Sequence, residues 1–262
     1  MIFLLFLLIG AVSGLLSGML GIGGGVVVIP CLVYLFEFIN IPNSDLMQMA
    51  LGTSISAVVL NVLFASRIHI NNKNYIKEPL KTLIISVIFG SVIGAIAAKY
   101  LPSLLLKELF AFFEIAIGVL IFYQKSNEDG THHKLPKGCK LFLIGTGVSL
   151  LSSILGIAGG VLMVPLLIHY RVPMRKAVGT STITSVFIAL VGGLIYGIAG
   201  FNEVTVPYSF GFIYLPAFAC IALGSVFASS YGVKLALKLP VKHLKRFFGL
   251  FLIGVGLVMT FV

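Results

Sequence analysis

Residues 17–30 read SGMLGIGGGVVVIP, and residues 152–165 read SSILGIAGGVLMVP. Each stretch contains a group of closely spaced glycines inside an apolar run, and each ends on a proline at the same distance. Gly24, Gly25 and Pro30 of the first stretch fall on Gly159, Gly160 and Pro165 of the second. The two stretches are therefore interpreted as copies of one structural motif.

Further matches surround these stretches in the same order. Gly-Thr-Ser occurs at 52–54 and again at 179–181, and Pro102 corresponds to Pro240. Ordered matches of this kind indicate an internal duplication. The prediction is a first transmembrane repeat, a cytoplasmic linker and a second transmembrane repeat, at residues 1–123, 124–140 and 141–262.

The composition excludes a water-soluble protein. Of the 262 residues, 59% are hydrophobic and only 10% are charged, and the mean hydropathy is +1.13. A soluble domain carries roughly 25% charged residues. Lipid must therefore be the solvent for most of the chain. The formal charge of +10 is explained by basic cytoplasmic loops, so nucleic acid is not expected as a partner.

Ten apolar runs are separated by connections that contain charged residues, proline or asparagine. Most are long enough for membrane helices, but the run at 159–170 reaches only about 18 Å, little more than half of the hydrocarbon core. The runs predict an all-α polytopic membrane protein. They lie at 1–20, 24–38, 46–66, 80–101, 103–123, 140–155, 159–170, 177–199, 208–233 and 244–262.

The distribution of basic residues decides how the chain crosses the membrane. If each glycine-rich run is the tip of a helical hairpin, either re-entrant or broken, 16 of the 18 Lys and Arg residues fall on one face, in four loops. Only Lys99 and Lys107 remain on the other face. Straight crossings would divide the charges almost equally, against the positive-inside rule. A hairpin and three further helices in each half make the repeats inverted, with both termini non-cytoplasmic. The four loops are 67–81, 125–140, 171–176 and 234–246.

The glycine-rich tips are candidate anion sites. A helix that starts at such a tip presents unpaired backbone N–H groups and the positive end of its dipole, and glycine lets an anion approach closely. Irregular backbone deep in a bilayer is tolerated where it is buried in protein or lines a cavity. The alternative is that the glycines only permit close helix packing. The candidates are Gly21, Gly23, Gly24, Gly25, Gly156, Gly159 and Gly160.

Neutral polar side chains follow each tip. Thr53 and Ser54 in the first half, and Thr180 and Ser181 in the second, supply hydroxyl donors that could hold an oxyanion without a fixed positive charge. Asn61 lies two turns after Ser54 and is a further candidate. Ordinary hydrogen bonding between membrane helices is the alternative for these residues.

Glu114 is the only carboxylate in the interior of a predicted crossing. An ionisable group there is costly and is a functional hypothesis by default, so a proton-coupling role is predicted. The alternative is a structural pair with a lysine. The five histidines show no ligand spacing, and neither a metal site nor a cofactor is expected.

The glycine-rich run at 21–30, its degenerate copy at 156–165 and the two Gly-Thr-Ser segments resemble the TauE/SafE family of sulfite exporters. The likeness covers essentially the whole chain. The second copy departs from the fuller pattern at Ala158, where the first copy has Gly23. The resemblance implies secondary transport of sulfite, a sulfonate or a related small anion.

The sequence thus predicts a secondary transporter, in a bacterial-type inner membrane, that exports a small sulfur-containing or organic anion and is coupled to protons. An anion channel that uses the same two tips remains the alternative. An enzyme is not expected, because the chain lacks GxSxG and HExxH runs. A P-loop of the GxxxxGK[ST] form is also missing from the sequence, so ATP does not drive transport within this chain.

Overall fold

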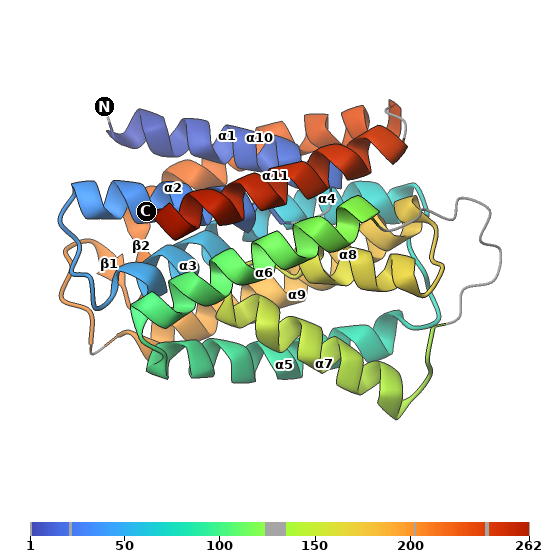
Figure 1. Ribbon diagram of the computed structural model, residues 1–262, viewed down its shortest axis with the longest axis horizontal. Helices are drawn as coiled ribbons and strands as arrows, with labels where there is room; N and C mark the ends of the chain where they lie inside the picture. The colour runs from blue at the N-terminus through green and yellow to red at the C-terminus, as the bar shows by residue number, and fades with distance from the viewer. Residues whose placement is uncertain (1, 21–22, 124–134, 202, 239–240, 262) are drawn as a thin grey trace.

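The computed structural model describes residues 2–20, 23–123, 135–201, 203–238 and 241–261, which form a helical bundle (Figure 1). In this described part, the extended segments are β1 (Ser209–Phe210) and β2 (Ile213–Tyr214), which pair antiparallel. The predicted all-α class is confirmed. The helices are α1 (Ile2–Leu20), α2 (Gly25–Phe38), α3 (Leu46–Ala57), α4 (Val59–Asn71), α5 (Leu80–Tyr100), α6 (Ser103–Tyr123), α7 (Cys139–Ile154), α8 (Gly160–His169), α9 (Met174–Ala199), α10 (Leu215–Lys238) and α11 (Val241–Phe261).

The surface of the bundle carries many exposed apolar side chains, and its mainly hydrophobic interior also buries many hydroxyl groups, as expected of a protein dissolved in lipid. Phe89 and Phe227 are more than half exposed, at 54% and 74%, whereas Ser13 and Thr53 are fully buried. This distribution confirms a multi-pass membrane protein. Within the described residues, five stretches are long and apolar enough to cross a bilayer, namely Ile2–Met19, Leu46–Asn71, Leu80–Tyr100, Met174–Ala199 and Leu215–Leu235.

The two glycine-rich runs form the turns of two hairpins. In Figure 1, α1 runs from one end of the bundle to its middle and α2 returns to the same end, while α7 and α8 do the same from the opposite end. With 14 and 10 residues, α2 and α8 reach about 21 Å and 15 Å, too short to span the hydrocarbon core. The runs are hairpin tips, as the charge distribution predicted.

The backbone of the second tip explains why α7 stops where it does. Gly156 is left-handed, with φ of +63°, and its N–H donates to the Ser153 carbonyl at 3.2 Å. The N–H of Ile157 donates to the Ser152 carbonyl at 3.0 Å. This is a Schellman ending, which satisfies the last carbonyls of a helix and turns the chain away. Glycine at 156 is needed because other residues rarely adopt this φ.

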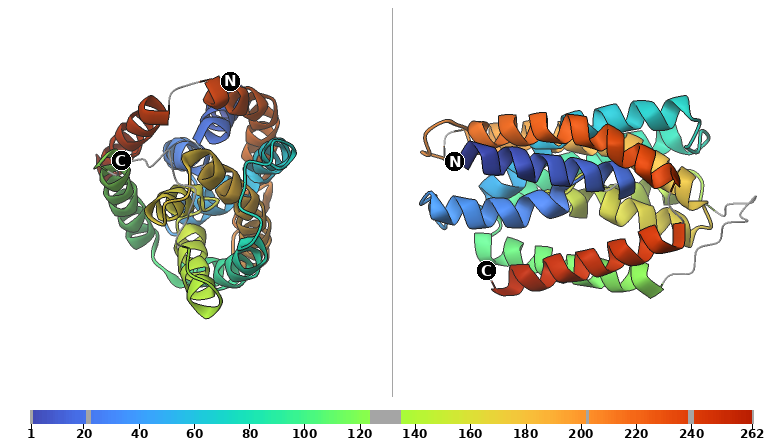
Figure 2. Two further views of the ribbon diagram at one scale, coloured as in Figure 1. Left: turned by 90° about the vertical axis from the view of Figure 1, so that its right-hand side faces the viewer. Right: turned by 90° about the horizontal axis from the view of Figure 1, so that it is seen from above.

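The three closest helix pairs each join one half of the chain to the other. The pairs are α1 with α10, α5 with α7, and α6 with α11. Small residues allow this close packing, because a Cβ added to Gly14 of α1 would lie only 2.6 Å from the Cα of Ser225 in α10. Seen end-on in Figure 2, α2 and α8 lie in the interior, and the α6–α11 pair lies to one side. The two halves therefore do not form separate bundles.

The loops sort to the two ends of the bundle. The described connections at 72–79, 135–138 and 170–173 lie at one end in Figure 1. Both chain ends, the loop at 39–45 and the β1–β2 hairpin lie at the other. At that second end, Lys99 forms an ion pair with Glu203, at 2.9 Å, that ties the end of α5 to the segment after α9.

Candidate functional site

The two hairpin tips meet inside the protein. A Cβ added to Gly23 would lie 2.5 Å from the Cβ of Ala158, and one added to Gly25 would lie 3.1 Å from the carbonyl oxygen of Gly156. The tips are therefore in van der Waals contact. The structure thus brings together the glycines that the sequence singled out in both halves. Gly21 lies outside the described residues.

Both tips point the start of a helix into this contact region. Gly24 and Gly159 precede α2 and α8, each with φ of +86°, and no side chain caps either helix. An uncapped helix start leaves backbone N–H donors unsatisfied and carries a positive partial charge. Gly25 and Gly160 are the first residues of the two helices. The arrangement can accept an anion at either start.

Buried polar atoms without partners surround the first tip. The Oγ of Ser54 lies 3.1 Å from the position that a Cβ on Gly25 would occupy, and this hydroxyl is fully buried with no hydrogen-bond partner. The Nδ2 of Asn61 donates to the Gly23 carbonyl at 3.4 Å, but its Oδ1 has no partner. A buried polar atom left unsatisfied costs about 1–3 kcal/mol, so these atoms indicate a place for a ligand or water.

The second tip has hydroxyl groups of its own, which the sequence reasoning missed. The Oγ of Ser152 lies 3.7 Å from the position of a Cβ on Gly159, and neither Ser152 nor Ser153 has a partner for its fully buried hydroxyl. Tyr196 of α9 donates from its hydroxyl to the Ser153 carbonyl at 2.9 Å. A Cβ added to Gly159 would contact Ile188, whereas one added to Gly24 would contact Asn61. Ile188 thus occupies in the second half the place of Asn61 in the first. Both serines lie within the repeated motif at 152–165, whereas no sequence pattern identifies Tyr196 as a neighbour of the tip.

Thr53 and Thr180 contact loops of the opposite half. The Thr53 hydroxyl accepts from the Tyr214 N–H at 2.9 Å, and the Thr180 hydroxyl accepts from the Ile76 N–H at 3.0 Å. These bonds give both threonines a structural role, with their O–H hydrogens still able to donate. Ser181 is fully buried in α9.

Known proteins match nearly the whole of this chain. Residues 6–259 match the family described as sulfite exporter TauE/SafE, a range that includes both hairpin tips. The chain belongs to this family. A "probable membrane transporter protein" of Haemophilus influenzae is 32% identical over 256 residues, which cover 97% of this chain and 96% of the relative. Another, of Methanocaldococcus jannaschii, is 30% identical over 243 residues, covering 92% and 89%. No solved structure matches significantly.

Glu114 is an isolated carboxylate in this TauE/SafE family member. It lies in α6 with 1% of its surface exposed, and neither carboxylate oxygen has a hydrogen-bond partner. Within the described residues, no Lys or Arg pairs with it. The alternative of a structural pair with a lysine thus gains no support from the described part of the chain. Glu114 is not among the nearest neighbours of the tip glycines.

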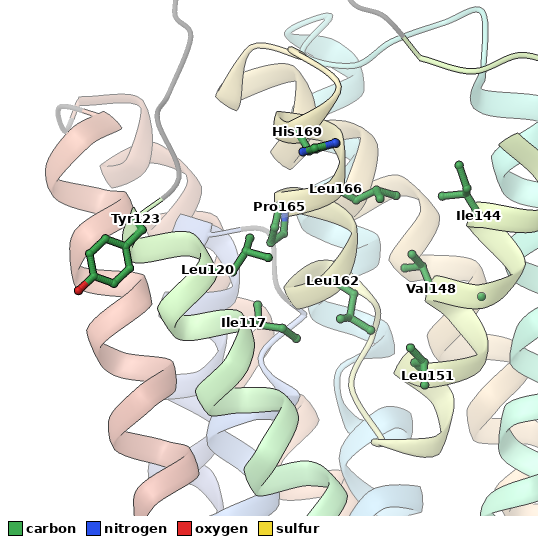
Figure 3. Close-up of a pocket in the computed structure, with 11 residues that line it drawn as sticks. Ile117, Leu120, Tyr123, Ile144, Val148, Leu151, Leu162, Pro165, Leu166 and His169 are labelled. Carbon is green, nitrogen blue, oxygen red and sulfur yellow. The ribbon is translucent and has the colours of Figure 1, made fainter. Parts of the chain in front are cut away.

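A cavity of about 720 Å³ lies beside the second hairpin, between α6, α7 and α8 (Figure 3). Leu151 and Leu162 line its part nearest to the tip, and His169 and Tyr123 are its polar members. The remaining wall is aliphatic, which suits an apolar chain better than a hydrated anion. The cavity thus differs in character from the polar contact region of the tips. The remaining lining residues are Ile117, Leu120, Ile144, Gly147, Val148, Pro165 and Leu166.

Proposed function

We propose that this protein is a secondary transporter that moves a small sulfur-containing or organic anion, such as sulfite or a sulfonate, across the plasma membrane. The anion binds between the two hairpin tips. The observation that carries the proposal is the meeting of two uncapped helix starts beside the unpartnered, fully buried hydroxyl of Ser54. Membership of the TauE/SafE family supports the choice of substrate.

The tips can hold an anion with donors that the protein leaves unused. Backbone N–H groups in the first turns of α2 and α8 donate to its oxygens, since no side chain caps either helix. The hydroxyls of Ser54 and Ser152 add neutral donors. Because these donors carry no full charge, the site binds the anion without trapping it, and release remains possible.

Contact between the tips favours a transporter over a channel. Gly23 and Ala158 are so close that an added Cβ would overlap the alanine. An anion held between the tips therefore requires the two hairpins to separate. In alternating-access transporters, one repeat moves against the other around a central binding site.

Flux into liposomes tests the proposed function. Purified protein is expected to exchange radiolabelled sulfite or methanesulfonate across the membrane with saturation, and unlabelled anion inside is expected to accelerate uptake of label. Counterflow of this kind distinguishes a transporter from a channel. Empty liposomes provide the background. Linear, non-saturating flux without counterflow would support the channel instead.

The orientation prediction follows from the loops at one end of the bundle, which contain Lys and Arg. We expect 72–79, 135–138 and 170–173 to face the cytoplasm, because insertion retains Lys and Arg on that side. Single cysteines placed at Lys77 and Arg171 should be labelled by a membrane-impermeant maleimide only after the cells are opened. A cysteine at Tyr208, in the opposite loop, should be labelled in intact cells. The reverse pattern would refute the assignment of the cytoplasmic face.

The coupling prediction concerns Glu114. If this carboxylate carries the coupled proton, Glu114→Gln should abolish the acceleration of anion flux by an imposed pH gradient, since glutamine keeps the volume but cannot titrate. Exchange at equal pH on both sides should continue. Glu108→Gln, on an exposed position of the same helix, is the matched control and should remain gradient-driven. Gradient-driven flux in the Glu114 variant would remove this residue from coupling.

A further inference from the structure

The Gly-Thr segment at 52–53 of α3 holds the loop between α9 and α10. A Cβ added to Gly52 would overlap the carbonyl oxygen of Phe212, so this loop lies directly against the helix. The N–H of Tyr214, two residues further along, donates to the Thr53 hydroxyl at 2.9 Å. Phe212 is 3% exposed and Thr53 is fully buried, so the loop reaches into the bundle. We call this contact the first clasp.

The Gly-Thr segment at 179–180 of α9 holds the loop between α4 and α5 in the same register. A Cβ added to Gly179 would overlap the carbonyl oxygen of Asn74. The N–H of Ile76, again two residues further along, donates to the Thr180 hydroxyl at 3.0 Å. Ile76 is 7% exposed and Thr180 is fully buried, so this loop also reaches into the bundle. We call this contact the second clasp.

The surroundings of the two clasps also correspond. The Cβ of Tyr196 lies 3.1 Å from the position of a Cβ on Gly52, and the Cβ of His69 lies 3.3 Å from that of a Cβ on Gly179. Tyr196 follows Gly179 at the same spacing along the chain as His69 follows Gly52. Each clasp is therefore built from the glycine and threonine of one half, and from a loop and a helix of the other. Such agreement indicates one arrangement used twice.

The two clasps lie between the hairpin tips and opposite ends of the bundle. The loop between α4 and α5 and the β1–β2 hairpin lie at opposite ends in Figure 1. Ser54 directly follows Thr53, and its hydroxyl lies 3.1 Å from the position of a Cβ on Gly25 at the first tip. The helix of the second clasp, α9, meets the second tip through Ile188, which a Cβ on Gly159 would overlap. Release of either loop would therefore loosen the cover of the tips from one end.

We infer that the two clasps are the gates of the transporter and that they open alternately, toward opposite sides of the membrane. This inference rests on the proposed function and specifies which contacts control access to its site. Both clasps are formed in this structure, which therefore represents the occluded state. Thr53 and Thr180 are positioning residues for the gate loops. One hydroxyl–amide bond suits a gate, because an N–H released toward water finds a new partner and the net cost of opening is small.

Labelling of a cysteine at the first tip tests the inference without requiring transport. Ser54→Cys, with the three native cysteines replaced by alanine, is exposed to a membrane-impermeant maleimide in right-side-out and in inverted membrane vesicles. Thr53→Val removes the acceptor of the first clasp and should raise the labelling rate about two- to tenfold, the worth of one net hydrogen bond, from the side of the β1–β2 hairpin only. Thr180→Val should raise it by a similar factor from the opposite side only.

Two sets of further variants control the experiment. Thr53→Ser and Thr180→Ser keep the hydroxyl and should be labelled at the parent rate. Gly52→Ala and Gly179→Ala displace the loops directly and should reproduce the sidedness of the valine variants, which preserves the test if a valine variant does not fold. Labelling that rises equally from both sides, or not at all, would make the clasps structural contacts only. Sided labelling without anion counterflow by the wild-type protein would instead overturn the proposed function, so the two failures are distinguishable.

Discussion

Replacing Gly24 or Gly159 by valine is expected to lower anion transport by at least about a hundredfold. Both residues have φ of +86° and immediately precede a helix start. A valine side chain would stand where the anion meets the backbone N–H groups. Loss of two hydrogen bonds to a charged ligand, each worth about 1.5–3 kcal/mol, accounts for this magnitude. The measurement is counterflow in liposomes at matched amounts of protein.

Valine at a positive φ also destabilises the folded backbone. A milder variant therefore distinguishes loss of the anion site from loss of the fold. Gly25 is the first residue of α2, and a Cβ there would lie 3.1 Å from both the Ser54 hydroxyl and the Gly156 carbonyl oxygen. Gly25→Ala should therefore remain folded and still lose transport. Gly254→Val, on α11 with open space around it, should behave as wild type. Normal transport by folded Gly25→Ala would identify the glycines as packing residues only.

Gly14→Val is expected to prevent assembly of the protein. The new side chain would meet the backbone of α10 at Ser225, which no rotamer change can move. Overpacking typically costs about 1–3 kcal/mol, and contact with backbone places this variant at or beyond the upper limit. We expect loss of the monodisperse peak in size-exclusion chromatography of detergent extracts.

The matched control for this variant is Gly147→Val in α7. That glycine also lies within a membrane helix, but a Cβ there would have no neighbour within 4 Å. The control should retain the monodisperse peak and the melting temperature of the wild type. If Gly14→Val did the same, the close approach of α1 and α10 would not be required for assembly.

The hairpins could be predicted from the sequence because membrane insertion retains positively charged loops on the cytoplasmic side, and the positions of Lys and Arg can be read directly from the sequence. The placement of Lys and Arg in 67–81 and 171–176 required each glycine-rich run to return to its starting side. The meeting of Gly23 and Gly25 with the second tip also agrees with the pairing of repeated motifs. These features depend on local composition and on the order of elements along the chain.

The partners of individual residues could not be predicted, because they depend on which helix faces which. Spacing of Gly10, Gly14 and Gly18 indicates a helix face for close packing but does not identify α10 as the neighbour. For the same reason, the bonds of Thr53 to Tyr214 and of Thr180 to Ile76 were not foreseen. Ser152 and Ser153 were overlooked because hydroxyls before a glycine tip have no distinctive spacing.

The pairing of α1 with α10 has a consequence for synthesis on the ribosome. The first helix ends at Leu20, whereas its partner begins at Leu215. At about 5–20 residues per second, the nascent chain waits about 10–40 s before the partner is made. Throughout this interval, the glycine face of α1 lacks the neighbour that covers it in the folded protein. Among the helices described, the first to be made is thus among the last to reach its final neighbour.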